Sequence, residues 1–305
     1  MNNVDFTELL LKKKYIEKFE KFQELSYKVC DLMNYNDMFT DKDRAACADC
    51  GEFVTFGITD DEQVRVCEAH FCRKRFCMMC QWRKSEKQFS NCLKLSERLS
   101  AQGYRFLHLV LTVPNCKGGA ELVETIKNMN KAFGLFIKNK EIKRAFKGIL
   151  RCLELSYNYD SFSFHPHFHC LVAVKKSYFT NNRQYIKYDR LRKLWTKAYK
   201  SKEPLQISIS TIKGDDNIGF AEVSKYCLKP LDFTKGTTVQ NAYVLYTLAY
   251  TLKGTRFQQS YGVIKTELAE IKEQNERAEI IKQMYDYVWD YREHKYKERG
   301  EKNTE

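Results

Sequence analysis

The chain has 305 residues, 43% of them hydrophobic, with 52 lysines and arginines against 39 aspartates and glutamates. The apolar content supplies a core for one large domain or two ordinary ones, while no run reaches the roughly 18 apolar residues of a membrane span and the N-terminus lacks a secretory-signal pattern. We therefore expect a globular cytoplasmic protein with no membrane partner, and the net charge of +13 favours a polyanionic partner, most simply nucleic acid.

Residues 1–46 form the first predicted region, an N-terminal helical segment. Apolar residues recur there at helical spacing, with lysines and glutamates between them, which is typical of an amphipathic helix. They are Leu9, Ile16, Phe19, Phe22, Val29 and Leu32. The pattern predicts packing or partner docking and no chemistry.

Residues 47–101 predict a cysteine-rich zinc module followed by a helix over about 84–101. In a reducing compartment, clustered cysteines are better interpreted as metal ligands than as disulfides, and two C-x-x-C pairs match a structural zinc site. Cys72, which lies near the second pair, is an alternative to Cys47 as the fourth ligand. The zinc ligands are predicted to be four of Cys47, Cys50, Cys72, Cys77 and Cys80. The alternative is a set of buried structural cysteines without a metal.

A basic and aromatic run surrounds the second pair of cysteines. Arginine and lysine suit contacts to phosphate, and tryptophan suits stacking on a base. The candidate DNA-binding residues are Arg73, Lys74, Arg75, Trp82 and Arg83. A solvated face is the equally weighted alternative.

Residues 102–235 predict an α+β domain. The expected elements are a strand over 106–113, a helix over 120–138, strands over 149–157 and 168–174, a helix over 189–200 and a strand over 205–210. The β-α-β-β order at the front of this domain is that of a ferredoxin-like or RNA-recognition-like antiparallel sheet with helices on one face.

Three of the six histidines of the chain lie within five residues, at His165, His167 and His169. Strand alternation puts them on one face, and a hairpin turning near 160–161 would place Glu154 opposite His167. A buried carboxylate among apolar residues is costly without a metal or a basic partner. Two histidines and a carboxylate suit Mg²⁺ or Mn²⁺, although a register slip by one residue would remove Glu154 from the site. His165 is either a further ligand or a neighbour of the ligands.

A segment that ends at Pro230 predicts a helix with a candidate nucleophile. Helical spacing places Glu222, Tyr226 and Lys229 on one face, with Lys225 beside them. A tyrosine flanked by lysines and a carboxylate is a candidate nucleophile. The alternative is a packing residue, since the chain has 19 tyrosines.

Together these motifs resemble the rolling-circle plasmid replication initiators of the HUH endonuclease superfamily. The resemblance spans about 47–261 and rests on four ordered motifs: the 71–83 cysteine run, the 106–115 strand, the 165–169 histidine run and the spacing of Glu222, Tyr226 and Lys229. The first strand carries fewer threonines than is usual in that family, and Met78 stands where proline is common. The resemblance implies an HUH endonuclease domain over 102–235, with the histidine strand central in its sheet.

This resemblance also implies the function: a site-specific, metal-dependent nick and strand transfer on single-stranded or cruciform origin DNA. His167, His169 and Glu154 would hold Mg²⁺ or Mn²⁺ at the scissile phosphate. Tyr226 would attack, which leaves a 5′-phosphotyrosine link and a free 3′-hydroxyl for the host helicase and replicative polymerase.

Further roles follow from the same resemblance. Lys225 or Lys229 would lower the pKa of the tyrosine or steady the phosphate, and Glu222 would activate water to end replication by hydrolysis. The alternatives are an HUH transposase or relaxase, which typically carries paired tyrosines, and a non-catalytic zinc-dependent DNA-binding regulator.

Residues 236–305 are expected to be a helical C-terminal region. It begins with a tyrosine-rich helix that carries Tyr243, Tyr246 and Tyr250 and continues as a charged segment over 266–302. The interpretations are an origin-binding element, a self-association element of a homodimer, or a solvated terminal helix.

Overall fold

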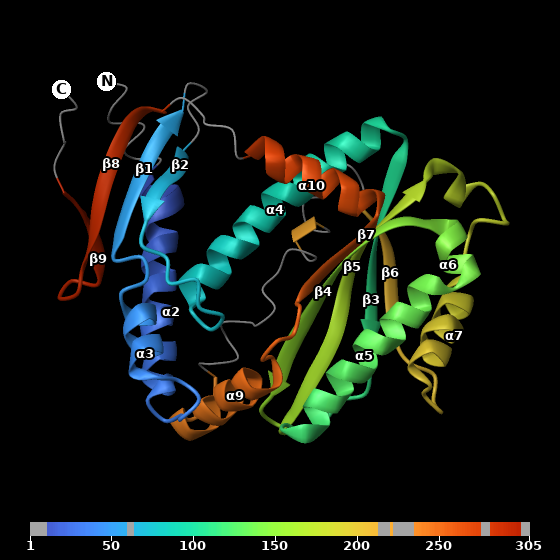
Figure 1. Ribbon diagram of the computed structural model, residues 1–305, viewed down its shortest axis with the longest axis horizontal. Helices are drawn as coiled ribbons and strands as arrows, with labels where there is room; N and C mark the ends of the chain where they lie inside the picture. The colour runs from blue at the N-terminus through green and yellow to red at the C-terminus, as the bar shows by residue number, and fades with distance from the viewer. Residues whose placement is uncertain (1–10, 60–63, 213–219, 222–234, 276–280, 300–305) are drawn as a thin grey trace. The chain divides into compact units, whose positions relative to one another are not determined.

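The computed structural model describes residues 11–59, 64–212, 220–221, 235–275 and 281–299 (Figure 1). It confirms the expected α+β class, with two antiparallel sheets. The chain divides into two units, one formed by residues 1–84, 237–245 and 277–305 and the other by residues 85–236 and 246–276. In the described part of the chain, no helix has the length and apolar content needed to span a membrane.

The first unit combines N-terminal helices with a four-stranded sheet of order β2-β1-β8-β9. Its elements are η1 (Lys12–Ile16), α2 (Glu17–Met33), α3 (Asp41–Ala48), β1 (Phe53–Thr59), β2 (Val64–Ala69), the start of α4 (Met78–Ala101), the start of α9 (Thr238–Thr251), β8 (Ile281–Asp290) and β9 (Lys295–Glu298). Strand β8 lies beside β1, from which more than 200 residues separate it, in an antiparallel pair (Figure 1). This long-range pairing joins the β1–β2 hairpin to the β8–β9 hairpin in one sheet.

The C-terminal region needs a correction. It contains the expected helices α9 (Thr238–Thr251) and α10 (Val263–Asn275), but residues 281–298 form β8 and β9 instead of continuing a charged helix. Tyr285, Tyr287 and Trp289 are buried at every second position of β8. This period of two is the pattern of a strand with one face in a core, and the many charged residues around it concealed it.

The second unit is built on a five-stranded sheet of order β6-β3-β5-β4-β7, so the histidine strand β5 is central, as expected. Its elements are the rest of α4, β3 (Tyr104–Thr112), α5 (Ala120–Lys138), α6 (Lys140–Ala145), β4 (Phe146–Asn158), β5 (Ser163–Lys175), η2 (Lys176–Phe179), α7 (Tyr188–Tyr199), β6 (Ile207–Ile212), the end of α9, β7 (Gln258–Gly262) and α10. The predicted helices and strands of 102–212 are all present, with small shifts at their ends.

The two faces of this sheet differ. Phe168 of β5 packs against Phe133 of α5 and Trp195 of α7, so these helices cover one face (Figure 1). Leu171 and Ala173 point the other way, into a core completed by residues of α4 and α10. Strand alternation puts the histidines on this second face.

Arg151 of β4 is buried on the face of the sheet opposite the histidines, next to Phe168. Its guanidinium lies 4.1 Å from the ring centre of Phe168 and donates hydrogen bonds to the side-chain oxygens of Asn130, at 2.5 Å, and Gln259, at 2.8 Å. These contacts tie β4 to β5, α5 and β7, which fixes the sheet behind the candidate site.

Candidate metal centres

A carboxylate and two imidazoles converge on the second face of the five-stranded sheet. The hairpin of β4 and β5 pairs Glu154 with His167, which confirms the predicted register. Oε2 of Glu154 lies 2.6 Å from Nε2 of His169 and 3.2 Å from Nε2 of His167. The three residues are 3%, 8% and 8% exposed, so the group is shielded from water.

The geometry of this triad fits a metal ion. One ligand atom from each of Glu154, His167 and His169 can be chosen so that all lie within 4.8 Å of one another. Nε2 of His169 is buried and, among the described residues, makes no hydrogen bond, although it lies 2.6 Å from Oε2 of Glu154. Two imidazole nitrogens and a carboxylate oxygen aimed at one point form a donor set that suits a divalent ion.

His165 lies beside the triad and outside it. Its Nδ1 is hydrogen-bonded to Oδ1 of Asn115, and its ring centre is 5.2 Å from that of His167. A cavity of about 520 Å³ opens here, lined among others by Asn115, Ser156, His165 and Lys235. The polar lining of this cavity thus includes His165, whose ring is next to that of His167 in the triad.

His108 of β3 is the residue that the sequence reasoning missed. Its Nε2 lies 3.0 Å from Nδ1 of His169, and the two rings are nearly parallel, at 11°. Strand pairing sets Val110 opposite His169, so His108 is a diagonal neighbour on the same face. The signal available was one histidine in the otherwise apolar run 106–111, and only the pairing of β3 with β5 brings it beside His169.

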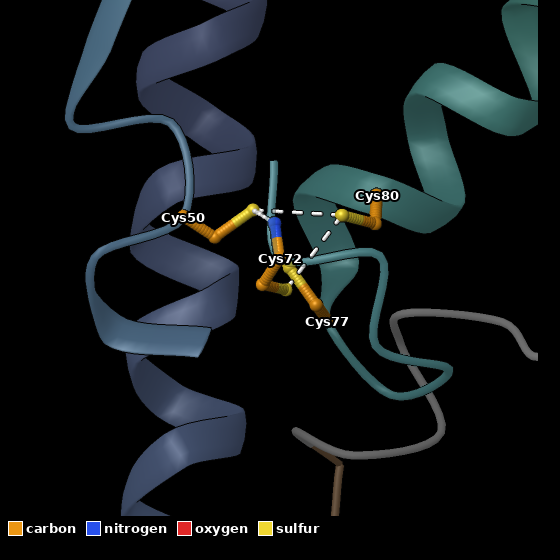
Figure 2. Close-up of side chains that lie close together, drawn as sticks. All are labelled: Cys50, Cys72, Cys77 and Cys80. Atoms are coloured by element: carbon orange, nitrogen blue, oxygen red, sulfur yellow. Dashed lines mark hydrogen bonds between the residues drawn. The ribbon is translucent and has the colours of Figure 1, made fainter. Parts of the chain in front are cut away.

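The second candidate centre lies in the first unit, where four cysteines gather (Figure 2). Sγ of Cys80 lies 3.5 Å from Sγ of Cys50 and 3.7 Å from Sγ of Cys72, and Cys77 completes the group. Cys47 lies outside these four, with its Sγ 4.0 Å from that of Cys72. The four sulfurs that lie within 4.8 Å of one another are therefore those of Cys50, Cys72, Cys77 and Cys80, and a tetrahedral thiolate site is the arrangement that structural zinc prefers.

The backbone around this cysteine group favours thiolates. Three consecutive amides, of residues 72–74, donate hydrogen bonds to sulfurs of the group at 3.2 to 3.4 Å. Hydrogen bonds between the thiols, that of Cys47 first, lower the pKa of Cys72 and Cys77, whereas the hydrogen bonds that Cys72 and Cys77 make in turn raise the pKa of Cys50 and Cys80. Since the thiolate is the form that binds a metal, the three amides are the part of this environment that suits a bound ion.

Trp82 corrects one prediction. It is 2% exposed and stacks on Phe22, with the ring centres 4.9 Å apart and an angle of 3° between the planes. Phe19 packs edge-on against the same ring at 4.8 Å. Trp82 is therefore a core residue of the first unit and does not present its ring to a base. The indole is more stable packed against the aromatic rings of α2 than exposed to water, because burial removes its apolar surface from solvent.

The predicted basic residues have different surroundings. Lys74 forms a 2.7 Å ion pair with Asp43, and Arg83 lies over the rings of Phe19, Phe71 and Trp82 at 5.5 to 5.9 Å. Arg73 is exposed and Arg75 is half-buried. A role of Arg73, Lys74, Arg75 and Arg83 in binding DNA stays a prediction.

The predicted nucleophile and its neighbours, Glu222, Lys225, Tyr226 and Lys229, lie outside the described residues. Just before them, Phe220 is helical and buried, with its ring centre 5.7 Å from that of Phe106. Phe106 lies on the same face of β3 as His108 by strand alternation. The chain therefore approaches the histidine face two residues before Glu222.

Comparison with known proteins gives the family. Residues 63–301 match the replication protein family. The chain belongs to this family. It is 35% identical over 188 residues to a protein named Protein rep from Staphylococcus aureus, with 61% of this chain and 81% of that protein covered. It is 34% identical over 222 residues to Protein rep from Lactiplantibacillus plantarum, with 70% and 69% covered. No solved structure matches the chain.

These relationships confirm the expected link to plasmid replication initiators at the level of the family.

Proposed function

We propose that this protein initiates rolling-circle plasmid replication by nicking one strand of origin DNA, as an HUH-type endonuclease with a single tyrosine. The observation that carries the proposal is the buried triad of Glu154, His167 and His169, whose ligand atoms converge on the central strand. Family membership and the net charge of +13 support nucleic acid as the substrate.

The triad would hold Mg²⁺ or Mn²⁺, which when bound polarises the scissile phosphate. The hydroxyl oxygen of Tyr226 forms a bond to phosphorus as the bond from phosphorus to the 3′-oxygen breaks. The tyrosine loses its proton and the departing 3′-oxygen gains one. The products are a 5′-phosphotyrosine link and a free 3′-hydroxyl, from which a host polymerase extends as a host helicase opens the duplex.

Lysines and a carboxylate complete the proposed chemistry. Lys225 or Lys229 steadies the phosphate or lowers the pKa of Tyr226, and Glu222 activates the water that ends replication by hydrolysis. The approach of Phe220 to the histidine face supports placing these side chains near the triad. The cavity beside His165 suits the polar groups of the DNA strand that enters the site.

Cys50, Cys72, Cys77 and Cys80 would hold a structural zinc ion in the first unit. The ion would fix three separate segments of chain and orient the neighbouring basic residues Arg73, Lys74, Arg75 and Arg83 toward DNA phosphates.

The test uses the full-length protein, Mn²⁺ and labelled single-stranded oligonucleotides tiled across the presumed origin, resolved on a denaturing gel. We expect a protein-linked product that is absent in Tyr226→Phe and His167→Ala. Tyr243→Phe is the matched control, because Tyr243 lies on α9 with 49% of its surface exposed. Tight zinc-dependent DNA binding without any adduct would contradict the proposal and favour a non-catalytic regulator.

A further inference from the structure

The side chain of His108 occupies a place where an apolar residue would ordinarily lie. Its sequence neighbours Leu107 and Leu109 are buried, and Phe106, on the same face of β3, belongs to the core under α4 and α10. A leucine at 108 would extend this core at no cost in desolvation. The half-buried imidazole therefore needs a hydrogen-bond partner, and His169 provides one.

His169 has two ring nitrogens with different surroundings. Nε2 faces Glu154 at 2.6 Å, at the centre of the triad, whereas Nδ1 faces Nε2 of His108 at 3.0 Å. A neutral imidazole carries one proton and one available lone pair. A divalent ion binds through the lone pair of Nε2, so the proton of the neutral ring must then be on Nδ1. A proton on Nδ1 needs a hydrogen-bond acceptor.

We propose that His108 is a positioning residue, which accepts a hydrogen bond from Nδ1–H of His169 and so holds the Nε2 lone pair of His169 toward a divalent cation. The inference rests on the proposed ion site and adds a residue to it from a third strand. The near-parallel rings, at 11° with centres 5.2 Å apart, also limit rotation of the His169 ring. Histidine ligands commonly pair their second nitrogen with a carboxylate or a backbone carbonyl, and here a second imidazole takes that place.

The test measures binding of Mn²⁺ alone to the full-length protein by calorimetry. His108→Leu keeps an apolar side chain of similar size but removes the acceptor, and we expect the affinity to fall about 10- to 100-fold, the range found for such outer partners. His108→Gln supplies a carbonyl oxygen at a similar reach, and its affinity should lie closer to wild type than to His108→Leu. Thr211→Val, exposed on the other face of the neighbouring strand β6, is the control and should bind as wild type does.

A second measurement reads the tautomer itself. With histidines labelled with ¹⁵N and Mg²⁺ bound, wild type and His108→Gln should show His169 protonated at Nδ1, while His108→Leu should show a mixture. Thermal unfolding of each variant identifies any loss of folding.

The outcomes separate this inference from the proposed function. If wild type and His108→Leu bind Mn²⁺ equally, or if His108→Gln is as weak as His108→Leu, the positioning role is wrong while the ion site stands. If wild type binds no Mn²⁺, the proposed ion site fails, and the role of His108 fails with it.

Discussion

Cys72 occupies the middle of the cysteine group, and its replacement by serine tests which residues form the site. Its Sγ lies 3.7 Å from that of Cys80 and 4.0 Å from that of Cys47, and it accepts the backbone N–H of Lys74 at 3.4 Å. A serine keeps the shape but removes the thiolate. We expect Cys72→Ser to bind zinc more weakly in the first unit.

The magnitude follows from the number of ligands. A structural zinc site contributes about 10–16 kcal/mol through four ligands, so one thiolate accounts for about 2.5–4 kcal/mol. The zinc affinity of Cys72→Ser should therefore fall by about 10²- to 10³-fold. Because binding stabilises only the folded form, the variant should also unfold at lower temperature.

Two other cysteines are matched controls for this experiment. Cys67 is exposed on β2 of the same unit, and Cys47 lies next to the four without belonging to them. Zinc per chain is measured by elemental analysis, and the affinity by competition with a chelator. Cys67→Ser and Cys47→Ser should both retain zinc. Retention by Cys72→Ser together with loss by Cys47→Ser would refute the ligand set, and absence of zinc from wild type would refute the site.

Two further predictions concern folding. Trp82→Ala should lower the free energy of unfolding in urea by about 3–5 kcal/mol, because it empties the stack on Phe22; unchanged stability with weaker DNA binding would instead favour base stacking. At Gly262 φ is +58° and a Cβ would lie 2.1 Å from the carbonyl oxygen of Lys147, so Gly262→Ala should destabilise by more than about 1 kcal/mol. Gly134 of α5 has open space around it, so Gly134→Ala should stabilise by about 0.5–1 kcal/mol. Equal effects of the two alanines would contradict this reasoning.

Local periodicity explains what could be predicted from the sequence. The apolar stripe over 120–138 coincides with α5, whose bounds are Ala120 and Lys138. Alternation in the 149–174 region, together with the turn near 160–161, placed Glu154 opposite His167, and the structure has this pair. Such predictions succeed because a short hairpin has few registers that keep every apolar side chain on its proper face.

Other features depend on contacts between distant parts of the chain. His108 and His169 are 61 positions apart and meet only because β3 pairs with β5. Strand β8 joins its sheet by pairing with β1, which lies far away in the sequence. Nothing local marks such pairings, since the free energy that decides them comes from the joint burial of both partners.

The sequence by itself determined the α+β class and the residue types of both candidate metal centres, because these follow from local periodicity and from chemistry that only histidine, cysteine and carboxylate side chains offer, while the central place of the histidine strand was implied by the family resemblance. Only the tertiary structure decided which four cysteines converge, that Trp82 is buried and that His108 lies beside His169. Each of these depends on the distance between side chains from separate segments, and packing of the whole unit sets that distance.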